Sequence, residues 1–182
     1  MLKKMTVALT GVAVFFAFSA GNAFAREYAH EIKDKKMSVA WSVEGDTLAI
    51  KMSAETDSWV GVGFNPSNQM KDANFILGYV KKGEAQIIDE FGTDMANHSS
   101  DEKLGGTTDA TLVGGTEEGG VTTIEFTIPL NSTDKNDGKI DVNGDTTLLM
   151  AYAMGRDSFK TKHRFRAEYK VNLSTGAAEE ID

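Results

Sequence analysis

Cysteine is absent from the 182-residue sequence, and histidine is scarce, with three residues. The lack of cysteine excludes a disulfide framework, a thiol nucleophile, a cysteine-based zinc site, an iron–sulfur cluster and a covalently attached c-type haem. Positive charge is also in deficit, since 19 Lys and Arg residues face 27 Asp and Glu residues, for a net charge of −8. That balance argues against a partner held through nucleic-acid phosphates. The 41% of hydrophobic residues and 25% of charged residues fit one globular domain.

Residues 1–25 have the order of a secretory signal peptide. Two lysines, Lys3 and Lys4, precede an uncharged and mostly apolar run over residues 6–20, and Ala23-Phe24-Ala25 provides an A-x-A cleavage signal. The alternative is an uncleaved anchor, but the apolar run is shorter than the roughly 20 residues that a membrane-spanning helix needs. We therefore expect cleavage after Ala25.

The remaining residues, 26–182, are predicted to form a single domain. Loss of the two lysines takes its net charge from −8 to −10, and no later apolar run is long enough to cross a membrane. The expected product is exported: it is periplasmic in a host with two membranes and secreted otherwise.

Periodic hydrophobicity predicts strands throughout this domain. Four segments alternate apolar and polar residues with a period of two, which is typical of strands with one buried face: 37–43, 47–54, 123–128 and 164–171. Three segments are apolar on both faces and suit central strands: 59–64, 75–80 and 148–154. Residues 85–91 and 111–113 are weaker candidates. About nine short strands without a convincing helix predict an all-β sandwich or barrel.

Two long segments, 92–109 and 131–145, are predicted to be loops, and loops of this length are often functional. The second is rich in Asp and Asn, whose oxygens can ligate calcium, but its spacing is not that of an EF-hand. A solvated turn, in which these side chains bond to the local backbone, is therefore favoured over calcium. The Gly61-Val62-Gly63 segment is not a dinucleotide fingerprint, because the third glycine position holds Pro66.

Met70 and His163 are the most informative candidates for chemistry. Met70 lies in a polar loop, where it departs from the core pattern, although it can also be a gap-filling residue that folds back onto the core. His163 lies at the entrance to a strand and, on local sequence alone, is best interpreted as a surface histidine. Together a methionine and a histidine can ligate haem iron. Basic residues near His163 can neutralise haem propionates: Arg156, Lys160, Lys162, Arg164 and Arg166.

The order of these motifs resembles a DOMON domain over roughly residues 36–176. Its first half is similar to WVGVGF (59–64), the loop with Met70, DANFILGYV (72–80) and DEF (89–91). Its second half is similar to IEFTIPL (124–130), the Asp-rich loop, LLMAYAMG (148–155) and then His163. The resemblance is to the haem-binding type, as in the cytochrome domain of cellobiose dehydrogenase and the haem subunit of ethylbenzene dehydrogenase.

This resemblance implies an immunoglobulin-like β-sandwich with a non-covalent b-type haem, whose iron is ligated by Met70 and His163. The cofactor is expected between the two sheets at one end of the sandwich. Gly61 and Gly63 would give it access to the backbone, Arg164 would be among the basic residues beside it, and the candidate pocket walls are Trp59, Phe64, Tyr152 and Met154. His98, in the less typical loop 92–109 that also carries Met95, is a competing ligand.

Three functions follow from these observations. The first is an exported b-type cytochrome that transfers single electrons to or from a redox partner. Because this chain is acidic, the partner is expected to have a basic docking surface. The second is a carbohydrate-binding module on the same fold, which needs no haem but requires an exposed aromatic platform. The third, a hydrolase with paired carboxylates, ranks last because no acid–base constellation is visible.

Overall fold

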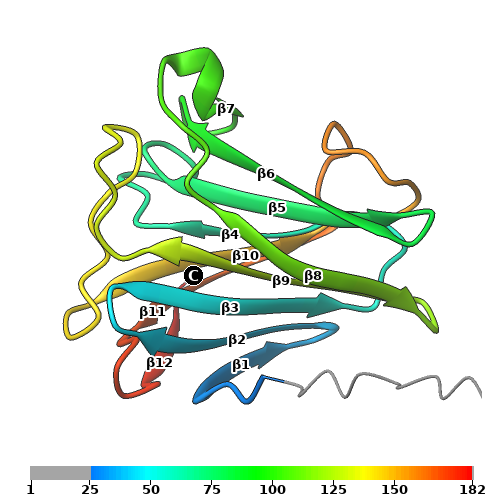
Figure 1. Ribbon diagram of the computed structural model, residues 1–182, viewed down its shortest axis with the longest axis horizontal. Helices are drawn as coiled ribbons and strands as arrows, with labels where there is room; N and C mark the ends of the chain where they lie inside the picture. The colour runs from blue at the N-terminus through cyan, green and yellow to red at the C-terminus, as the bar shows by residue number, and fades with distance from the viewer. Residues whose placement is uncertain (1–25, 182) are drawn as a thin grey trace, which may run out of the picture.

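The structure, a computed structural model, describes residues 26–181, and they form two antiparallel sheets packed face to face (Figure 1). The predicted signal peptide lies outside the described residues. One sheet has five strands in the order β1-β2-β3-β9-β8, and the other has seven in the order β12-β11-β10-β4-β5-β6-β7. The predicted all-β sandwich is confirmed.

The five-stranded sheet contains the period-two segments near the N-terminus and their partner in the middle of the chain. Its strands are β1 (His30–Asp34), β2 (Met37–Glu44), β3 (Thr47–Ala54), β8 (Thr111–Glu118) and β9 (Val121–Pro129). The β2–β3 hairpin turns at Gly45, whose positive φ of 61° suits a tight turn.

The seven-stranded sheet has the doubly apolar segments at its centre. Its strands are β4 (Val60–Phe64), β5 (Asn74–Lys81), β6 (Glu84–Gly92), β7 (His98–Ser100), β10 (Thr146–Tyr152), β11 (Phe165–Val171) and β12 (Ala178–Ile181). The strand predicted over 148–154 ends at Tyr152, because the backbone then leaves the sheet and Met154 is exposed.

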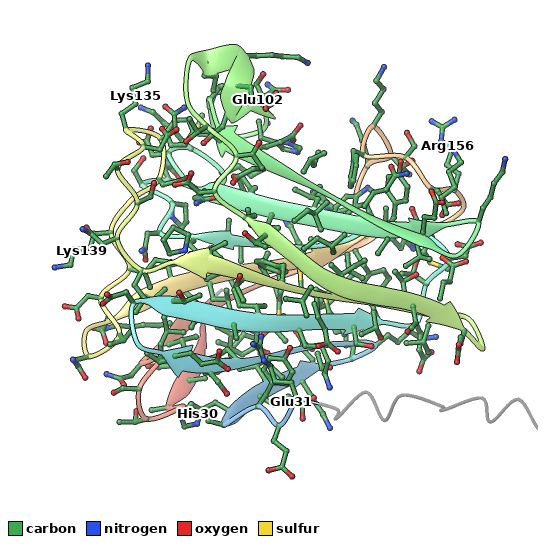
Figure 2. The ribbon with its side chains drawn as sticks, in the orientation of Figure 1. His30, Glu31, Glu102, Lys135, Lys139 and Arg156 are labelled. Carbon is green, nitrogen blue, oxygen red and sulfur yellow. The ribbon has the colours of Figure 1, made fainter. Side chains whose placement is uncertain are left out.

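The predicted loop 92–109 contains two short elements. They are β7, which pairs with the end of β6, and a 3₁₀-helix, η1 (Asp101–Leu104). The predicted loop 131–145 has no strand or helix. Both segments lie at the same end of the sandwich, where Figure 2 shows Glu102 of η1 beside Lys135 of the loop, with Lys139 lower down.

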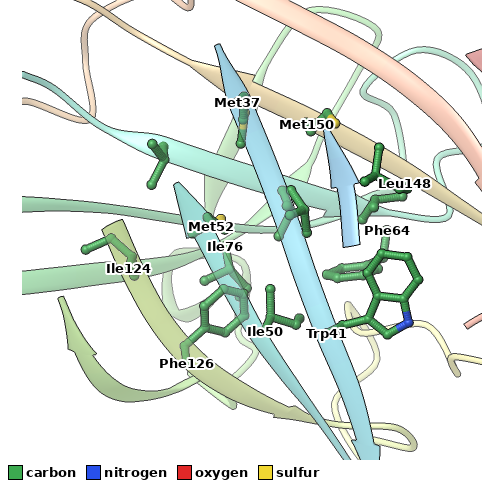
Figure 3. Close-up of a cluster of buried hydrophobic side chains, with 14 of the residues drawn as sticks. Met37, Trp41, Ile50, Met52, Phe64, Ile76, Ile124, Phe126, Leu148 and Met150 are labelled. Atoms are coloured by element: carbon green, nitrogen blue, oxygen red, sulfur yellow. The ribbon is translucent and has the colours of Figure 1, made fainter. Parts of the chain in front are cut away.

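The space between the sheets is filled by one apolar core (Figure 3). Trp41 of β2 is 1% exposed and lies among side chains from both sheets, and its indole Nε1–H donates a hydrogen bond of 2.9 Å to the carbonyl oxygen of Leu173. Phe126 of β9, in the same sheet, and Leu148 of β10, in the opposite sheet, are equally buried. Burial of a large apolar side chain contributes about 1.5–3 kcal/mol, so this core is the main source of stability.

Candidate functional site

A second apolar cluster lies on the other face of the seven-stranded sheet, away from the five-stranded one. Because successive side chains of a strand point to opposite faces, Val60, Val62 and Phe64 of β4 enter the main core, while Gly61 and Gly63 face outward. We call this second group the outer cluster. Its buried members are Trp59, Ala73, Phe75, Leu77, Tyr79 and Ala153, and its half-buried members are Met70, Ile88, Leu149, Ala151 and Phe159.

Glycines on β4 make room for the large side chains of the outer cluster. A Cβ atom at Gly63 would overlap the ring of Phe75, which pairs with it from β5. A Cβ at Gly61 would lie 3.0 Å from Leu77 Cγ and 3.4 Å from Trp59 Cζ3. Both rings and the leucine therefore lie directly over the β4 backbone, which is the close approach that glycine in a strand permits.

The loop from Ala153 to Arg164 covers one part of the outer cluster. Its backbone is held by the indole of Trp59, whose Nε1–H donates to the Thr161 carbonyl at 2.8 Å. The ring of Phe159 lies 4.4 Å from that of Tyr79, centroid to centroid. This loop, drawn in orange in Figure 1, thus leads from β10 across the outer cluster to His163.

The loop between β4 and β5 places Met70 against the same cluster. Its end is tied to β6, because the N–H of Asp72 donates to the Gly92 carbonyl at 2.8 Å and the N–H of Gly92 donates to the Ala73 carbonyl at 2.9 Å. The Met70 side chain is half-buried against the cluster. Both sequence interpretations of Met70 stay compatible with this placement, since a ligand and a gap-filling methionine would each contact the apolar side chains.

His163 is exposed, and partial desolvation together with the charges of Arg166, His98 and Lys162 lowers its pKa. The lowered pKa favours the neutral imidazole, which is the form that ligates metals. His98, the competing ligand, lies on β7 with its ring 5.5 Å from that of Phe75 and its Nδ1 paired with Glu90. His98 therefore borders the outer cluster through Phe75, and His163 lies near enough to His98 for the charge of His98 to affect its pKa.

The structure divides the predicted site residues between the two faces of the sheet. Trp59, Gly61 and Gly63 belong to the outer face, together with Met70. Phe64 and Tyr152 instead point into the main core, where Tyr152 stacks on Phe165 at 5.3 Å. Met154 is 52% exposed and Arg164 is also exposed.

The expected cofactor position between the sheets needs correction. The side chains of the main core fill that space, and the two glycines and Met70 lie on the opposite side of the seven-stranded sheet. The correction follows from the period of two along β4, because Gly61 and Phe64 cannot face the same side of one regular strand.

Sequence reasoning missed several members of the outer cluster, in particular Phe75, Leu77 and Phe159. β5 is apolar on both faces, so its sequence indicates burial on both sides but not which residues accompany the glycines. The signal for Phe159 is weaker still, since it is a single aromatic residue in a polar loop.

Comparison with known proteins identifies the family. The family model of the DOMON domain matches residues 33–153. The chain belongs to the DOMON family. Met70 lies within the matched residues of this DOMON chain, and His163 lies ten residues beyond them.

Two curated relatives are DBH-like monooxygenase protein 1 of Homo sapiens, 30% identical over 131 residues, and that of Mus musculus, 28% identical over 135 residues. These matches cover 70% and 72% of this chain, respectively. The chain spans only 20% of the length of the human relative and 21% of that of the mouse relative.

Solved structures share the fold. The cytochrome b domain of pyranose dehydrogenase from Coprinopsis cinerea matches with a TM-score of 0.59 at 16% identity, over 77% of this chain and 78% of that one. The cytochrome domain of Myriococcum thermophilum cellobiose dehydrogenase matches with a TM-score of 0.59 at 13% identity, over 79% and 77%. Within residues 26–181, no helix has the length and hydropathy needed to span a bilayer.

Proposed function

We propose that this DOMON chain binds one b-type haem non-covalently and transfers single electrons. The observation that carries the proposal is the outer cluster, an apolar surface contacted by Met70 from one loop and by Phe159 from the loop that leads to His163. Similarity of fold to two cytochrome domains supports it. When bound, the haem supplies one-electron chemistry, and a methionine ligand raises its potential.

The residues present fit such a group. Trp59, Phe75 and Leu77 provide an apolar surface that excludes water, and Gly61 and Gly63 let these side chains lie close against β4. In the structure these side chains pack against one another, so binding requires the Met70 loop and the loop 153–164 to separate. The loops are the parts of the fold that can do so, because the strands beneath them are fully paired.

Positive side chains near His163 are available for the haem propionates. Among the described residues, none of the basic side chains of this segment forms an ion pair: Arg156, Lys160, Lys162, Arg164 and Arg166. Arg156 donates only to the hydroxyl of Thr161, at 3.2 Å. Their charges favour a dianionic ligand locally in a chain whose net charge is −8.

We further propose export through the signal peptide at residues 1–25 and a redox partner with a basic docking surface. The acidic balance of 27 Asp and Glu against 19 Lys and Arg residues would steer such a partner toward the protein. The structure offers less support for the carbohydrate-binding alternative. Among the described residues every Trp and Tyr side chain is buried or half-buried, so none of them provides an exposed platform.

The test is a spectrum of the mature chain, purified from haem-replete cells, in its oxidised and reduced forms. We expect one haem per chain with sharp low-spin bands on reduction. Met70→Leu should change the bands and lower the potential, because the thioether ligand that raises the potential is replaced by a side chain that cannot ligate iron. Loss of a group that only orients a metal ligand typically weakens binding by about 10–100-fold. Because His163 is proposed as a ligand itself, His163→Ala should weaken haem binding by at least this much.

Met95→Leu is the matched methionine control, since Met95 is 51% exposed and its sulfur contacts only the Asn68 amide among the described residues. Its spectrum should equal that of the wild type. His98→Ala tests the competing histidine. If this variant lost the low-spin bands while the spectrum of His163→Ala equalled that of the wild type, His98 would be the ligand in place of His163. A colourless protein that takes up no added haemin would contradict the proposal.

A further inference from the structure

Three buried carboxylates meet at the end of the sandwich where η1 and the loop 131–145 lie together (Figure 2). Asp89 comes from β6, Asp101 begins η1, and Asp137 comes from the loop; one oxygen from each lies within 4.8 Å of the others. Their residues are 4%, 1% and 8% exposed. Among the described residues, no lysine or arginine pairs with them.

Unpartnered oxygen atoms gather around these carboxylates. Within residues 26–181, five buried oxygens have no hydrogen-bond partner: both carboxylate oxygens of Asp101, one oxygen each of Asp89 and Asp137, and the amide oxygen of Asn74. Asn74 is 8% exposed and neutral, so its free Oδ1 is evidence independent of the acidic cluster. Buried polar groups are nearly always satisfied, and a set of free oxygens in one place is typical of an ion site.

The surrounding structure orients these oxygens. Asp89 Oδ2 accepts the backbone N–H groups of Asp109 and Ala110 at 3.0 and 3.2 Å, which leaves Oδ1 free. Asp137 Oδ1 accepts from Asn74 Nδ2 at 2.6 Å, which leaves Oδ2 free. In each carboxylate, a hydrogen bond holds one oxygen and leaves the other free. Hydrogen bonds of this kind orient the carboxylates that ligate metals in proteins.

The two segments that meet here are packed closely. A Cβ at Gly106, just after η1, would lie 2.6 Å from both Asn136 Nδ2 and Asp134 Oδ2. Asn136 Nδ2 is itself buried without an acceptor, and a rotation of its amide would offer an oxygen instead. The site is therefore enclosed by residues from β6, η1 and the loop.

We infer that Asp89, Asp101 and Asp137, together with the amide oxygen of Asn74, form a calcium site. The donor set consists of oxygens, whereas structural zinc sites use cysteine and histidine. Calcium accepts six to eight oxygens in flexible geometry, which suits carboxylates that come from separate segments and still have free lone pairs. The inference does not depend on haem.

Burial without a cation disfavours the charged forms of these groups. Desolvation raises the pKa of Asp89 and Asp101 to about 6 and that of Asp137 to about 7, and repulsion among the neighbouring carboxylates contributes to each shift. A divalent cation would compensate both effects. It would also link the loop 131–145 to β6 and to the segment after β7.

The experiment uses the mature chain after treatment with a chelator, with metal removal verified by elemental analysis. Titration with CaCl₂ in a calorimeter should show one site with a dissociation constant below about 1 mM, the weak end for extracellular calcium modules. The thermal midpoint should rise with calcium and fall again on addition of chelator. The same titration with MgCl₂ should show binding at least tenfold weaker.

Asp101→Asn is the decisive variant, because both oxygens of Asp101 are unpartnered and the substitution keeps the shape of the side chain. We expect at least a tenfold loss of calcium affinity and a thermal midpoint that no longer responds to calcium. Asp141→Asn is the control: Asp141 lies in the same acidic loop but is exposed, and its side chain accepts, among the described residues, only the Asn143 N–H, at 3.1 Å. It should bind calcium as the wild type does.

The inference would be overturned if the wild type showed no calcium binding below about 1 mM. It would also be overturned if Asp101→Asn bound calcium as tightly as the wild type. Tighter binding of magnesium would reject calcium as the ion. Should Asp101→Asn fail to fold, the wild-type titration still decides whether the site exists, and Asp89→Asn repeats the test. Met70→Leu should leave calcium binding unchanged, which separates this site from the proposed haem site.

Discussion

Gly92→Ala is expected to detach the Met70 loop from the end of β6 and to destabilise the protein strongly. A Cβ atom at Gly92 would overlap the backbone carbonyl of Met70, and backbone atoms cannot move aside as the end of a flexible side chain can. The backbone hydrogen bonds of Gly92 with Asp72 and Ala73 would have to lengthen or break. Overpacking of about 1–3 kcal/mol and the loss of a hydrogen bond worth about 1 kcal/mol together predict a loss of about 2–4 kcal/mol.

Urea denaturation checks the free energy of unfolding, and the thermal midpoint should fall by about 4–16 °C for a domain of this size. Gly114→Ala on β8 is the matched control, because a Cβ there meets open space, and it should change stability by less than about 0.5 kcal/mol. Equal stability of Gly92→Ala and wild type would show that the Met70 loop is not held against β6. If Met70 ligates haem, Gly92→Ala should also reproduce part of the spectral change of Met70→Leu.

Trp41→Ala is expected to have the largest effect of any core substitution. The side chain is 1% exposed, lies between the sheets and donates its indole hydrogen bond to Leu173 (Figure 3). Truncation of a buried tryptophan costs about 3–5 kcal/mol through lost burial and the cavity that remains. Since domains of this kind are stable by about 5–15 kcal/mol, the variant should lose between about a fifth and all of its free energy of unfolding.

Trp41→Phe separates the two contributions, because it keeps part of the aromatic volume but leaves the carbonyl of Leu173 without its donor. A loss of about 1–3 kcal/mol is expected for that unsatisfied group, less than for alanine. Val43→Ala, at the 36% exposed end of the same strand, should cost much less. Chemical denaturation of the three variants would contradict this account if Trp41→Ala lost less stability than Val43→Ala.

Much of the fold could be predicted from local pattern. The alternation in β2, β3, β9 and β11 follows directly from one apolar face, and each was located within a residue or two. The missed strands, β1, β7 and β12, are short and lie at sheet edges. Their sequences, such as His-Glu-Ile-Lys-Asp in β1, are polar, and they form strands because a neighbouring backbone is available to pair with them.

The candidate site could be predicted only in part. Met70 and the glycines of β4 stood out in the sequence because a methionine in a polar loop and glycines in an apolar strand each depart from the pattern around them, and the structure places them on one face of the sheet. The face was not predictable, since β4 and β5 are apolar on both sides and no periodicity shows which side meets the other sheet. The calcium candidate shows the same limit: the Asp-rich loop was visible, but only Asp137 from it enters the cluster.

The sequence by itself determined the class of fold, the placement of most strands and the exclusion of all cysteine chemistry, because these depend on residue type and on a period of two along the chain. Tertiary structure alone decided that the glycines and Met70 share the outer face of the seven-stranded sheet. It alone brought Asp89, Asp101 and Asp137 together from three segments. Both results depend on which strands pair and which loops meet at an end of the sandwich, and long-range packing sets those contacts rather than the local pattern.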